Sequence, residues 1–152
     1  MMSKSQLTHP RPPVLMQLPG FAISHLGRKV RGAMKSAFAR EGLSTQAHFV
    51  LLCLAEYGQI SQRELADLLE MDRSDLVRLL DAMEGEGDIQ RRPHPGDRRR
   101  YALSVTPRGM ETLERGAHLV HEATDAALAR LDSDERETLH RLVLRALDVP
   151  DL

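Results

Sequence analysis

The chain has 152 residues and a mass of 17.1 kDa, with 41% hydrophobic, 28% charged and 3% aromatic residues. This length predicts one domain that holds a core without covalent staples, and a single cysteine excludes an intrachain disulfide framework. No apolar run approaches the ~20 residues of a membrane span, and no signal peptide is evident at the N-terminus, so we expect a cytoplasmic protein without a membrane partner. Scarce aromatics and the absence of Trp favour a mainly α fold.

The net charge of −1 conceals an uneven distribution. Residues 1–43 contain seven Lys and Arg against one acidic residue, whereas residues 44–106 contain eight against eleven and residues 107–152 six against ten. Within residues 91–100, five arginines are opposed by Asp97 alone. Because a DNA backbone meets local rather than total charge, the near-neutral sum does not exclude nucleic acid.

The first part of the chain predicts an arm and two helices. Residues 1–19 contain four prolines and few periodic apolar positions, which predicts an extended N-terminal arm. From Phe21, apolar residues recur at helical spacing as far as Gly42. A second helix, from Ser44 to Gly58, is apolar nearly all round, so we expect it to be central and buried.

A helix pair follows, and its helix starts are marked by capping residues. Ser61 and Glu64 form a capping-box pattern that opens a short helix. Asp72 can cap the next helix, predicted over residues 73–84, whose Leu and Met stripe faces inward and whose polar residues face outward. A short capped helix, a brief turn and a helix with a polar outer face are typical of a helix-turn-helix.

A charged hairpin and two more helices complete the pattern. Residues 89–93 and 100–105 predict two strands around a Pro-Gly-Asp turn, and such a hairpin directly after a helix-turn-helix is a wing. Thr106 and the following proline predict the start of a long helix. The capping pattern from Asp132 to Glu135 predicts a last helix.

Residues of the helix pair and wing fit DNA recognition. Arginines at positions 73 and 78 can donate to guanine or phosphate, Ser74 to phosphate, and Val77 can meet a thymine methyl group. At the wing tip an arginine can enter the minor groove, held by Asp97 through a charge-assisted hydrogen bond. The full set that we expect at the DNA interface is Ser61, Gln62, Arg73, Ser74, Asp75, Val77, Arg78, Arg91, Asp97, Arg98, Arg99 and Arg100.

These motifs resemble the MarR (multiple antibiotic resistance regulator) family of winged helix-turn-helix transcription factors. The stretches that carry the resemblance are Ile60–Ala66, Met71–Ser74, Leu79–Gly87, Pro95–Arg100 and Leu103–Gly109. The resemblance implies a homodimer that binds a pseudo-palindromic, double-stranded DNA operator and that a small molecule, metal or oxidant can release.

The resemblance also implies a domain plan. We expect a single winged helix-turn-helix domain over residues 20–148, with a DNA-binding core at 44–106 and dimerisation helices at 20–42 and 107–148. Two residues depart from the family pattern. Asp75 stands where Ser or Thr is more common, and it would repel phosphate unless it caps the helix or accepts from a cytosine. Asp88 replaces an aliphatic residue before the wing, which questions the packing at that corner.

The sequence offers several candidate sensors. Cys53 lies in an apolar helical run without a basic neighbour in sequence, so we expect a small core residue and no thiol sensing. Histidine–carboxylate pairs at i, i+4, such as His118 with Glu122, could present two metal ligands, but such pairs are common by chance. We therefore expect no metal or other cofactor, and a small organic effector in a pocket formed by His25, His48, Leu52, His118 and His121.

No enzyme motif is found. A metalloprotease-like string begins at His121, but Asp125 stands where the second histidine belongs, and no phosphate-binding glycine loop or nucleophile elbow occurs. We expect a repressor. An activator or dual regulator of the same family, or a helical adaptor that has lost DNA binding, remain alternatives, although an adaptor has no need for the wing arginines.

Overall fold

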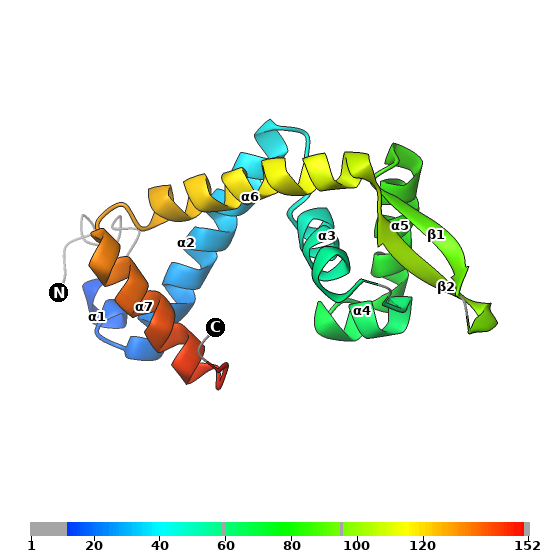
Figure 1. Ribbon diagram of the computed structural model, residues 1–152. Helices are drawn as coiled ribbons and strands as arrows, with labels where there is room; N and C mark the ends of the chain where they lie inside the picture. Colours follow the sequence, from blue (N-terminus) through cyan, green and yellow to red (C-terminus); the bar gives the residue numbers. More distant parts are fainter. Residues whose placement is uncertain (1–11, 59, 95, 151–152) are drawn as a thin grey trace. The chain divides into compact units, whose positions relative to one another are not determined.

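The computed structural model describes residues 12–58, 60–94 and 96–150, except for the side chains of residues 98–100. Its elements, labelled in Figure 1, are α1 (Pro13–Met16), α2 (Pro19–Arg40), α3 (Thr45–Tyr57), α4 (Gln62–Leu68), α5 (Arg73–Glu86), β1 (Ile89–His94), β2 (Asp97–Val105), α6 (Pro107–Ala127) and α7 (Ser133–Ala146). The predicted mainly α fold with a two-stranded wing is confirmed.

The chain forms two compact units. One unit contains Met1–Ala33 and Glu122–Leu152, and the other contains Met34–His121. The division falls inside α2 and α6, so each of these helices contributes to both units. The boundaries expected from the sequence lie at helix ends, because local propensity indicates where a helix stops and not which residues it packs against.

The first unit differs from the predicted arm. Pro13–Met16 form one helical turn and α2 begins at Pro19, so the expectation of an extended chain was wrong for these positions. Proline is compatible with the first turn of a helix, because the N–H groups of that turn form no intrahelical hydrogen bonds and the N–H that proline lacks is not needed. Residues 1–11 of the predicted arm lie outside the described residues.

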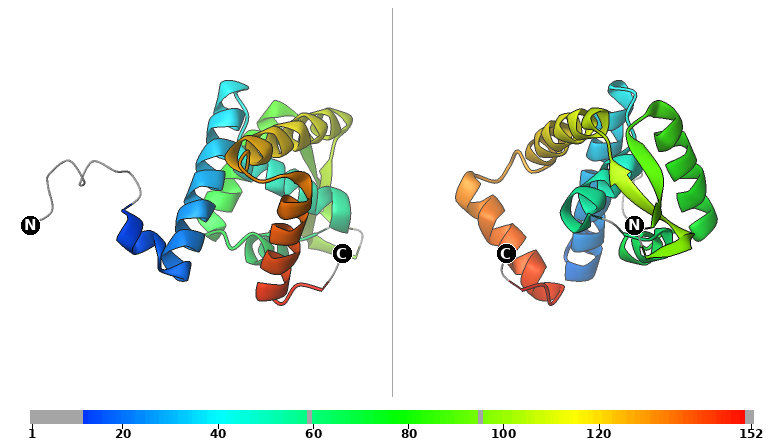
Figure 2. Two further views of the ribbon diagram at one scale, coloured as in Figure 1. Left: turned by 90° about the vertical axis from the view of Figure 1, so that its left-hand side faces the viewer. Right: turned by 45° about the vertical axis from the view of Figure 1, so that its right-hand side comes forward.

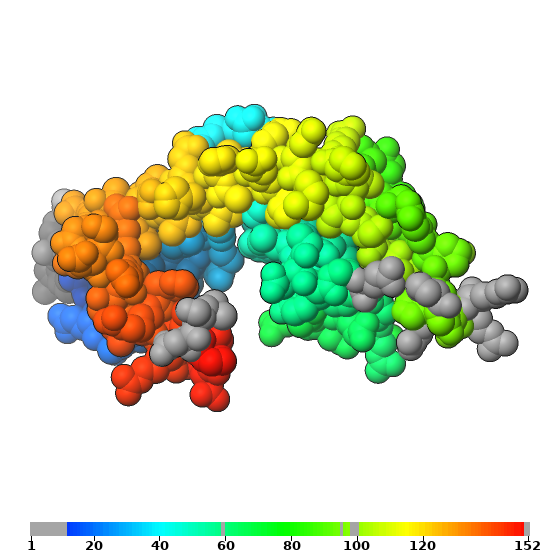
Figure 3. Space-filling model, in the orientation of Figure 1, coloured from blue at the N-terminus to red at the C-terminus, as the bar shows by residue number. Residues whose placement is uncertain are grey.

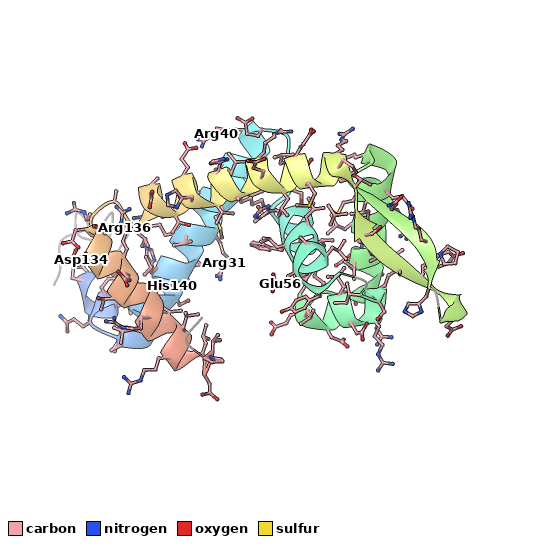
Figure 4. All side chains as sticks on the ribbon, in the orientation of Figure 1. Arg31, Arg40, Glu56, Asp134, Arg136 and His140 are labelled. Carbon is pink, nitrogen blue, oxygen red and sulfur yellow. The ribbon has the colours of Figure 1, made fainter. Side chains whose placement is uncertain are left out.

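Side chains of α2 and α7 fasten the end of α6 within this unit. Lys29 donates to the carbonyl of Ala127 at 2.5 Å, where the last turn of α6 leaves carbonyls without intrahelical donors. Arg136, labelled in Figure 4, pairs with Asp125 at 2.7 Å and donates to the Leu131 carbonyl at 3.0 Å. The predicted capping box that opens α7 is present.

The second unit contains the hydrophobic core of the helix pair and wing. The fully buried side chains of this unit come from α2, α3, α4, α5 and both strands, and they include Phe38, Val50, Leu51, Leu65, Leu76, Leu80, Met83, Ile89 and Leu103. The space-filling view shows α3 and α4 packed into one continuous mass (Figure 3). The helix pair therefore has a fixed scaffold behind it.

Helix α3 is less buried than its sequence suggests. Phe49 is 36% and Leu52 44% exposed, while the opposite side of the helix, with Val50, Leu51 and Leu54, is buried. The prediction of burial all round was wrong, because apolar composition does not tell which side of a helix its own protomer covers.

The wing is a two-stranded antiparallel sheet. Ile89 pairs with Val105 and Pro93 with Tyr101, and the register shifts at His94, which pairs with Asp97. A bridge between Ile60 and Leu103 joins the wing to the segment before α4. Figures 1 and 2 show the wing beside α5.

Candidate nucleic-acid interface

Helix α4 begins with a capping box that includes the side chain of Ser61, a residue expected at DNA. The Ser61 hydroxyl donates to Glu64 at 2.5 Å and accepts from the Glu64 N–H at 3.2 Å, while the Ser61 N–H donates to the Glu64 carboxylate at 2.9 Å. Gln62 is the first residue of the helix and is half-buried. The Ser61 side chain therefore fixes the start of α4, and the role of Gln62 at DNA stays a prediction.

Helix α5 is capped in the predicted way. The Asp72 carboxylate accepts from the Ser74 hydroxyl at 2.5 Å and from the Ser74 N–H at 2.8 Å. These hydrogen bonds from Ser74 hold the pKa of Asp72 below its ordinary value. The Ser74 hydroxyl, expected to donate to phosphate, thus donates to the cap in this structure.

One side of α5 faces the core and the other faces solvent. Leu76, Leu80 and Met83 are buried, whereas Val77 is exposed. The other exposed residues of the first two turns are Arg73, Ser74, Asp75 and Arg78. The helical spacing predicted this division, and the exposed side is the one available to a DNA groove.

Asp75 is paired rather than isolated. Its carboxylate forms an ion pair with Arg78 one turn later, and both side chains are largely exposed. An exposed pair at this spacing contributes only ~0.3–0.5 kcal/mol. Arg78 can therefore exchange Asp75 for a phosphate or a base at little cost, and the local repulsion expected from Asp75 is reduced while the pair is intact.

The Arg91 side chain, which we expected at DNA, contacts two carboxylates of α5. Its guanidinium donates to Glu84 at 2.5 Å and to Asp81 at 2.6 Å, and its backbone N–H donates to Glu84 at 3.1 Å. The side chain is only 18% exposed. Burial acts to lower the pKa of Arg91, but the hydrogen bonds that it donates to Asp81 and Glu84 outweigh burial and raise the pKa. We call this set, Arg91 with Asp81 and Glu84, the wing clasp.

The wing clasp is a feature that sequence reasoning missed. Asp81 was assigned to the outer face of its helix and Glu84 to its end, without partners. Two features of the sequence could have indicated it. The i, i+3 spacing of the two acidic residues places both carboxylates on one side of α5, and an arginine occurs in the strand that begins three residues after the helix.

The wing tip carries the remaining expected DNA contacts. Strand β2 begins at Asp97, three residues earlier than predicted, so positions 98–100 are part of the strand. The Gly96 N–H donates to His94 Nδ1 at 3.1 Å across the turn. Because the side chains of Arg98, Arg99 and Arg100 lie outside the described part, their roles stay predictions.

The corner before the wing is well packed despite its carboxylate. Asp88 is buried and accepts from the Thr112 hydroxyl at 3.1 Å, with the Arg108 guanidinium at 3.4 Å. Thr106 donates through its hydroxyl to the Gly87 carbonyl at 2.6 Å. A side chain at Gly109 would place its Cβ 2.0 Å from the Asp88 carbonyl oxygen, so only glycine allows this approach. The doubt about packing at Asp88 is thereby resolved.

Of the residues expected in the effector pocket, one belongs to the first unit and four belong to the second. His48 is buried, whereas Leu52, His118 and His121 are exposed, and His25, in the other unit, stacks on Phe21 with ring centroids 6.3 Å apart. His48 also lines a pocket of the second unit, together with Phe38, Leu79 and Thr112.

Two other candidate sensors can be compared with the structure. Cys53 is partly buried against the core, and burial raises the pKa of its thiol, which lowers the fraction of reactive thiolate. Among the described residues, no group of three or more His, Cys, Asp and Glu side chains is placed to hold a metal ion.

Comparisons with known proteins agree with this geometry. A model of the MarR family matches residues 43–101. A protein of Thauera aromatica assigned to regulation of the hcr operon is 36% identical over 126 residues, covering 80% of this chain and 75% of its own. The multiple antibiotic resistance protein MarR of Escherichia coli is 31% identical over 105 residues, covering 68% and 73%.

The fold comparison points the same way. The structure of the transcriptional repressor CouR bound to a 23-mer DNA duplex aligns with a TM-score of 0.79 and 29% identity, over 92% of this chain and 99% of that one. In the described part of the chain, no helix is long and apolar enough to cross a membrane. The chain belongs to the MarR family of DNA-binding transcriptional regulators, which are not enzymes.

Proposed function

We propose that the protein is a repressor that binds a pseudo-palindromic operator as a homodimer and is released by a small organic effector. The observation that carries the proposal is the exposed side of α5, with Arg73, Val77 and Arg78, set on a buried scaffold and followed by an arginine-rich wing. An α-helix of this kind fits the major groove, and a charged hairpin fits the adjoining minor groove.

Exposed apolar side chains support the homodimer. Helix α7 contains no buried residue within the protomer, although its sequence is amphipathic. The exposed apolar side chains of the first unit are Val14, Leu15, Leu18, Ile23, Leu142, Val143, Leu147 and Val149. A second copy of the chain would cover such residues in the family's dimer, and it would set two recognition helices ~34 Å apart, one turn of duplex.

Relatives support the repressing role and DNA as the partner. CouR is named as a transcriptional repressor and was solved on duplex DNA. Transferred to this chain, these properties predict that operator binding blocks transcription of the regulated gene. The effector part of the proposal rests on the family to which the chain belongs, and the residues expected in the pocket stay a prediction: His25, His48, Leu52, His118 and His121.

The operator should first be recovered by selecting bound fragments from the native genome. Operator affinity is then measured by gel-shift titration for the full chain and for Arg73→Ala, which should weaken binding by about 1–3 kcal/mol without unfolding the protein. Arg115→Ala is the matched control, since it removes an exposed arginine of the same unit from α6. The Arg73 variant should also reduce the salt dependence if it contacts phosphate.

Three results would refute parts of the proposal. Failure to retain any genomic fragment favours the adaptor alternative, and a monomer in sedimentation at operator-binding concentrations excludes the dimer. Deletion of the gene should raise expression from a reporter carrying the operator, and a fall instead would identify an activator.

A further inference from the structure

Tyr101 is a large side chain of the wing that the hydrophobic core does not use. It is 60% exposed, whereas Leu103, two residues further along β2, is fully buried. None of the hydrogen bonds between described residues involves the Tyr101 hydroxyl. The wing therefore presents an aromatic ring and a hydrogen-bond donor to its surroundings, in addition to its arginines.

The register of the wing indicates the side of the sheet on which Tyr101 lies. Arg91 pairs with Leu103, and Pro93 pairs with Tyr101. Because side chains alternate along a strand and paired residues share a side, these four residues lie on one side of the sheet. The guanidinium of Arg91 reaches two carboxylates of α5, so this is the side of the wing that faces the recognition helix.

Tyr101 lies beyond the wing clasp, toward the wing tip. The wing clasp joins β1 to the last two turns of α5, and two further residues of extended strand cover ~7 Å, slightly more than one helical turn of ~5.4 Å. Figure 1 shows the strands running from the end of α5 along the helix to a tip that stands clear of it. Tyr101 is therefore level with the turn of α5 that carries the exposed Val77 and Arg78.

This position faces the backbone of a bound duplex rather than its base edges. When a recognition helix occupies the major groove and a wing the adjoining minor groove, the phosphate backbone that divides the two grooves passes between them. The side of the wing that faces α5 is turned toward that backbone. Pro93, the cross-strand neighbour of Tyr101, is short and exposed, so β1 leaves the phenol ring accessible from this side.

We propose that the Tyr101 hydroxyl donates a hydrogen bond to a DNA phosphate between the two grooves. A tyrosine is one of the side chains that bind phosphate, and such contacts fix the register of a protein on the duplex without reading its sequence. Unlike an arginine, the neutral phenol releases no counterion, so its contribution to affinity is independent of salt. This contact rests on the operator binding of the proposed function and adds a residue to its interface.

Operator affinity of the full chain and of Tyr101→Phe can be measured by gel-shift titration at several salt concentrations. The variant keeps the ring and should bind about tenfold more weakly, because it lacks roughly one hydrogen bond to a charged acceptor. The slope of log affinity against log salt should stay the same. The same factor should apply to an operator with a changed base pair, since a phosphate contact carries no sequence information.

Tyr57→Phe is the matched control, because Tyr57 is 61% exposed in the same unit but belongs to α3. It should leave operator affinity unchanged. Thermal midpoints of both variants should equal that of the original chain, because neither hydroxyl contributes to the fold. A lower midpoint for Tyr101→Phe alone would show a structural role for its hydroxyl and refute the DNA contact.

Operators with single uncharged methylphosphonates, placed symmetrically in both half-sites, would locate the contact. At one position the substitution should weaken binding of the original chain at least threefold more than binding of Tyr101→Phe. Equal losses at every position, or an unchanged affinity of Tyr101→Phe for the unmodified operator, would refute the contact and leave the proposed function intact. An original chain that retains no DNA would refute the proposed function and this contact together.

Discussion

Replacing Arg91 by methionine should loosen the wing from the recognition helix. Methionine keeps an unbranched apolar stem but has no donor for Asp81 and Glu84, which the guanidinium reaches at 2.6 and 2.5 Å. The stem of Arg91 is mostly covered, so the substitution tests the hydrogen-bonded charge rather than the packing.

The size of the effect follows from the exposure of the partners. A hydrogen bond to a charged group contributes ~1.5–3 kcal/mol when shielded, but Asp81 is 59% and Glu84 39% exposed, so solvent screens both. We expect the free energy of unfolding to fall by about 1–2 kcal/mol in total. For a chain of this length that is a decrease of roughly 3–6 °C in Tm.

Urea unfolding of Arg91→Met, Glu84→Gln and the double variant would measure the coupling between the two side chains. Arg92→Met is the matched control, because the neighbouring Arg92 is exposed and donates to Gln90 at 3.2 Å. A coupling energy of at least 0.5 kcal/mol is expected for residues in direct contact. Zero coupling, or a loss in Arg91→Met no larger than in Arg92→Met, would refute the wing clasp.

Three further substitutions or conditions test other parts of the structure. Gly109→Ala should lower the free energy of unfolding by more than 3 kcal/mol, because its Cβ would lie 2.0 Å from a backbone oxygen, and a normal urea midpoint would contradict this. Burial lowers the pKa of His48 in the folded protein, so the stability contributed by its neutral ring should be complete above about pH 6.5 and should decline as the pH falls through the folded-state pKa. The variant His48→Phe should lack this decline in the free energy of unfolding. Identical pH profiles for the variant and the original chain would contradict the lowered pKa of His48. Glu70 has φ 50°, so Glu70→Gly should raise the free energy of unfolding by about 0.5 kcal/mol in thermal melts, whereas a decrease would show that the left-handed turn is not strained.

The sequence predicted elements whose determinants are local. Ser61, Glu64 and Asp72 specify helix starts through side chains that reach only two or three residues along the chain, and each forms the expected hydrogen bonds. The wing strands were also predicted from local pattern, except that β2 begins earlier than predicted. The run of arginines at its start has no alternation of apolar and polar residues that would indicate a strand.

Features that depend on contacts between elements were not predictable in this way. Full burial was expected for α3, but the exposed side of Leu52 depends on neighbours that the sequence of one helix does not specify. Arg91 was assigned to DNA because it belongs to a basic run, and only the packing of β1 against α5 directs it to two carboxylates. Asp88 was doubtful for the same reason, because its donors come from α6.

Besides the bridge between Ile60 and Leu103, two polar contacts attach the wing to the helices of its unit, at positions three residues apart in sequence. Arg91 fastens it to α5, and Asp88 fastens its base to α6 through Thr112 and Arg108. Because Arg91 links β1 to the recognition helix α5, it holds the two DNA-reading elements in one arrangement. Arg91→Met, which removes this link, should therefore weaken operator binding in a gel-shift titration, and an unchanged affinity would show that the link does not position the wing for DNA.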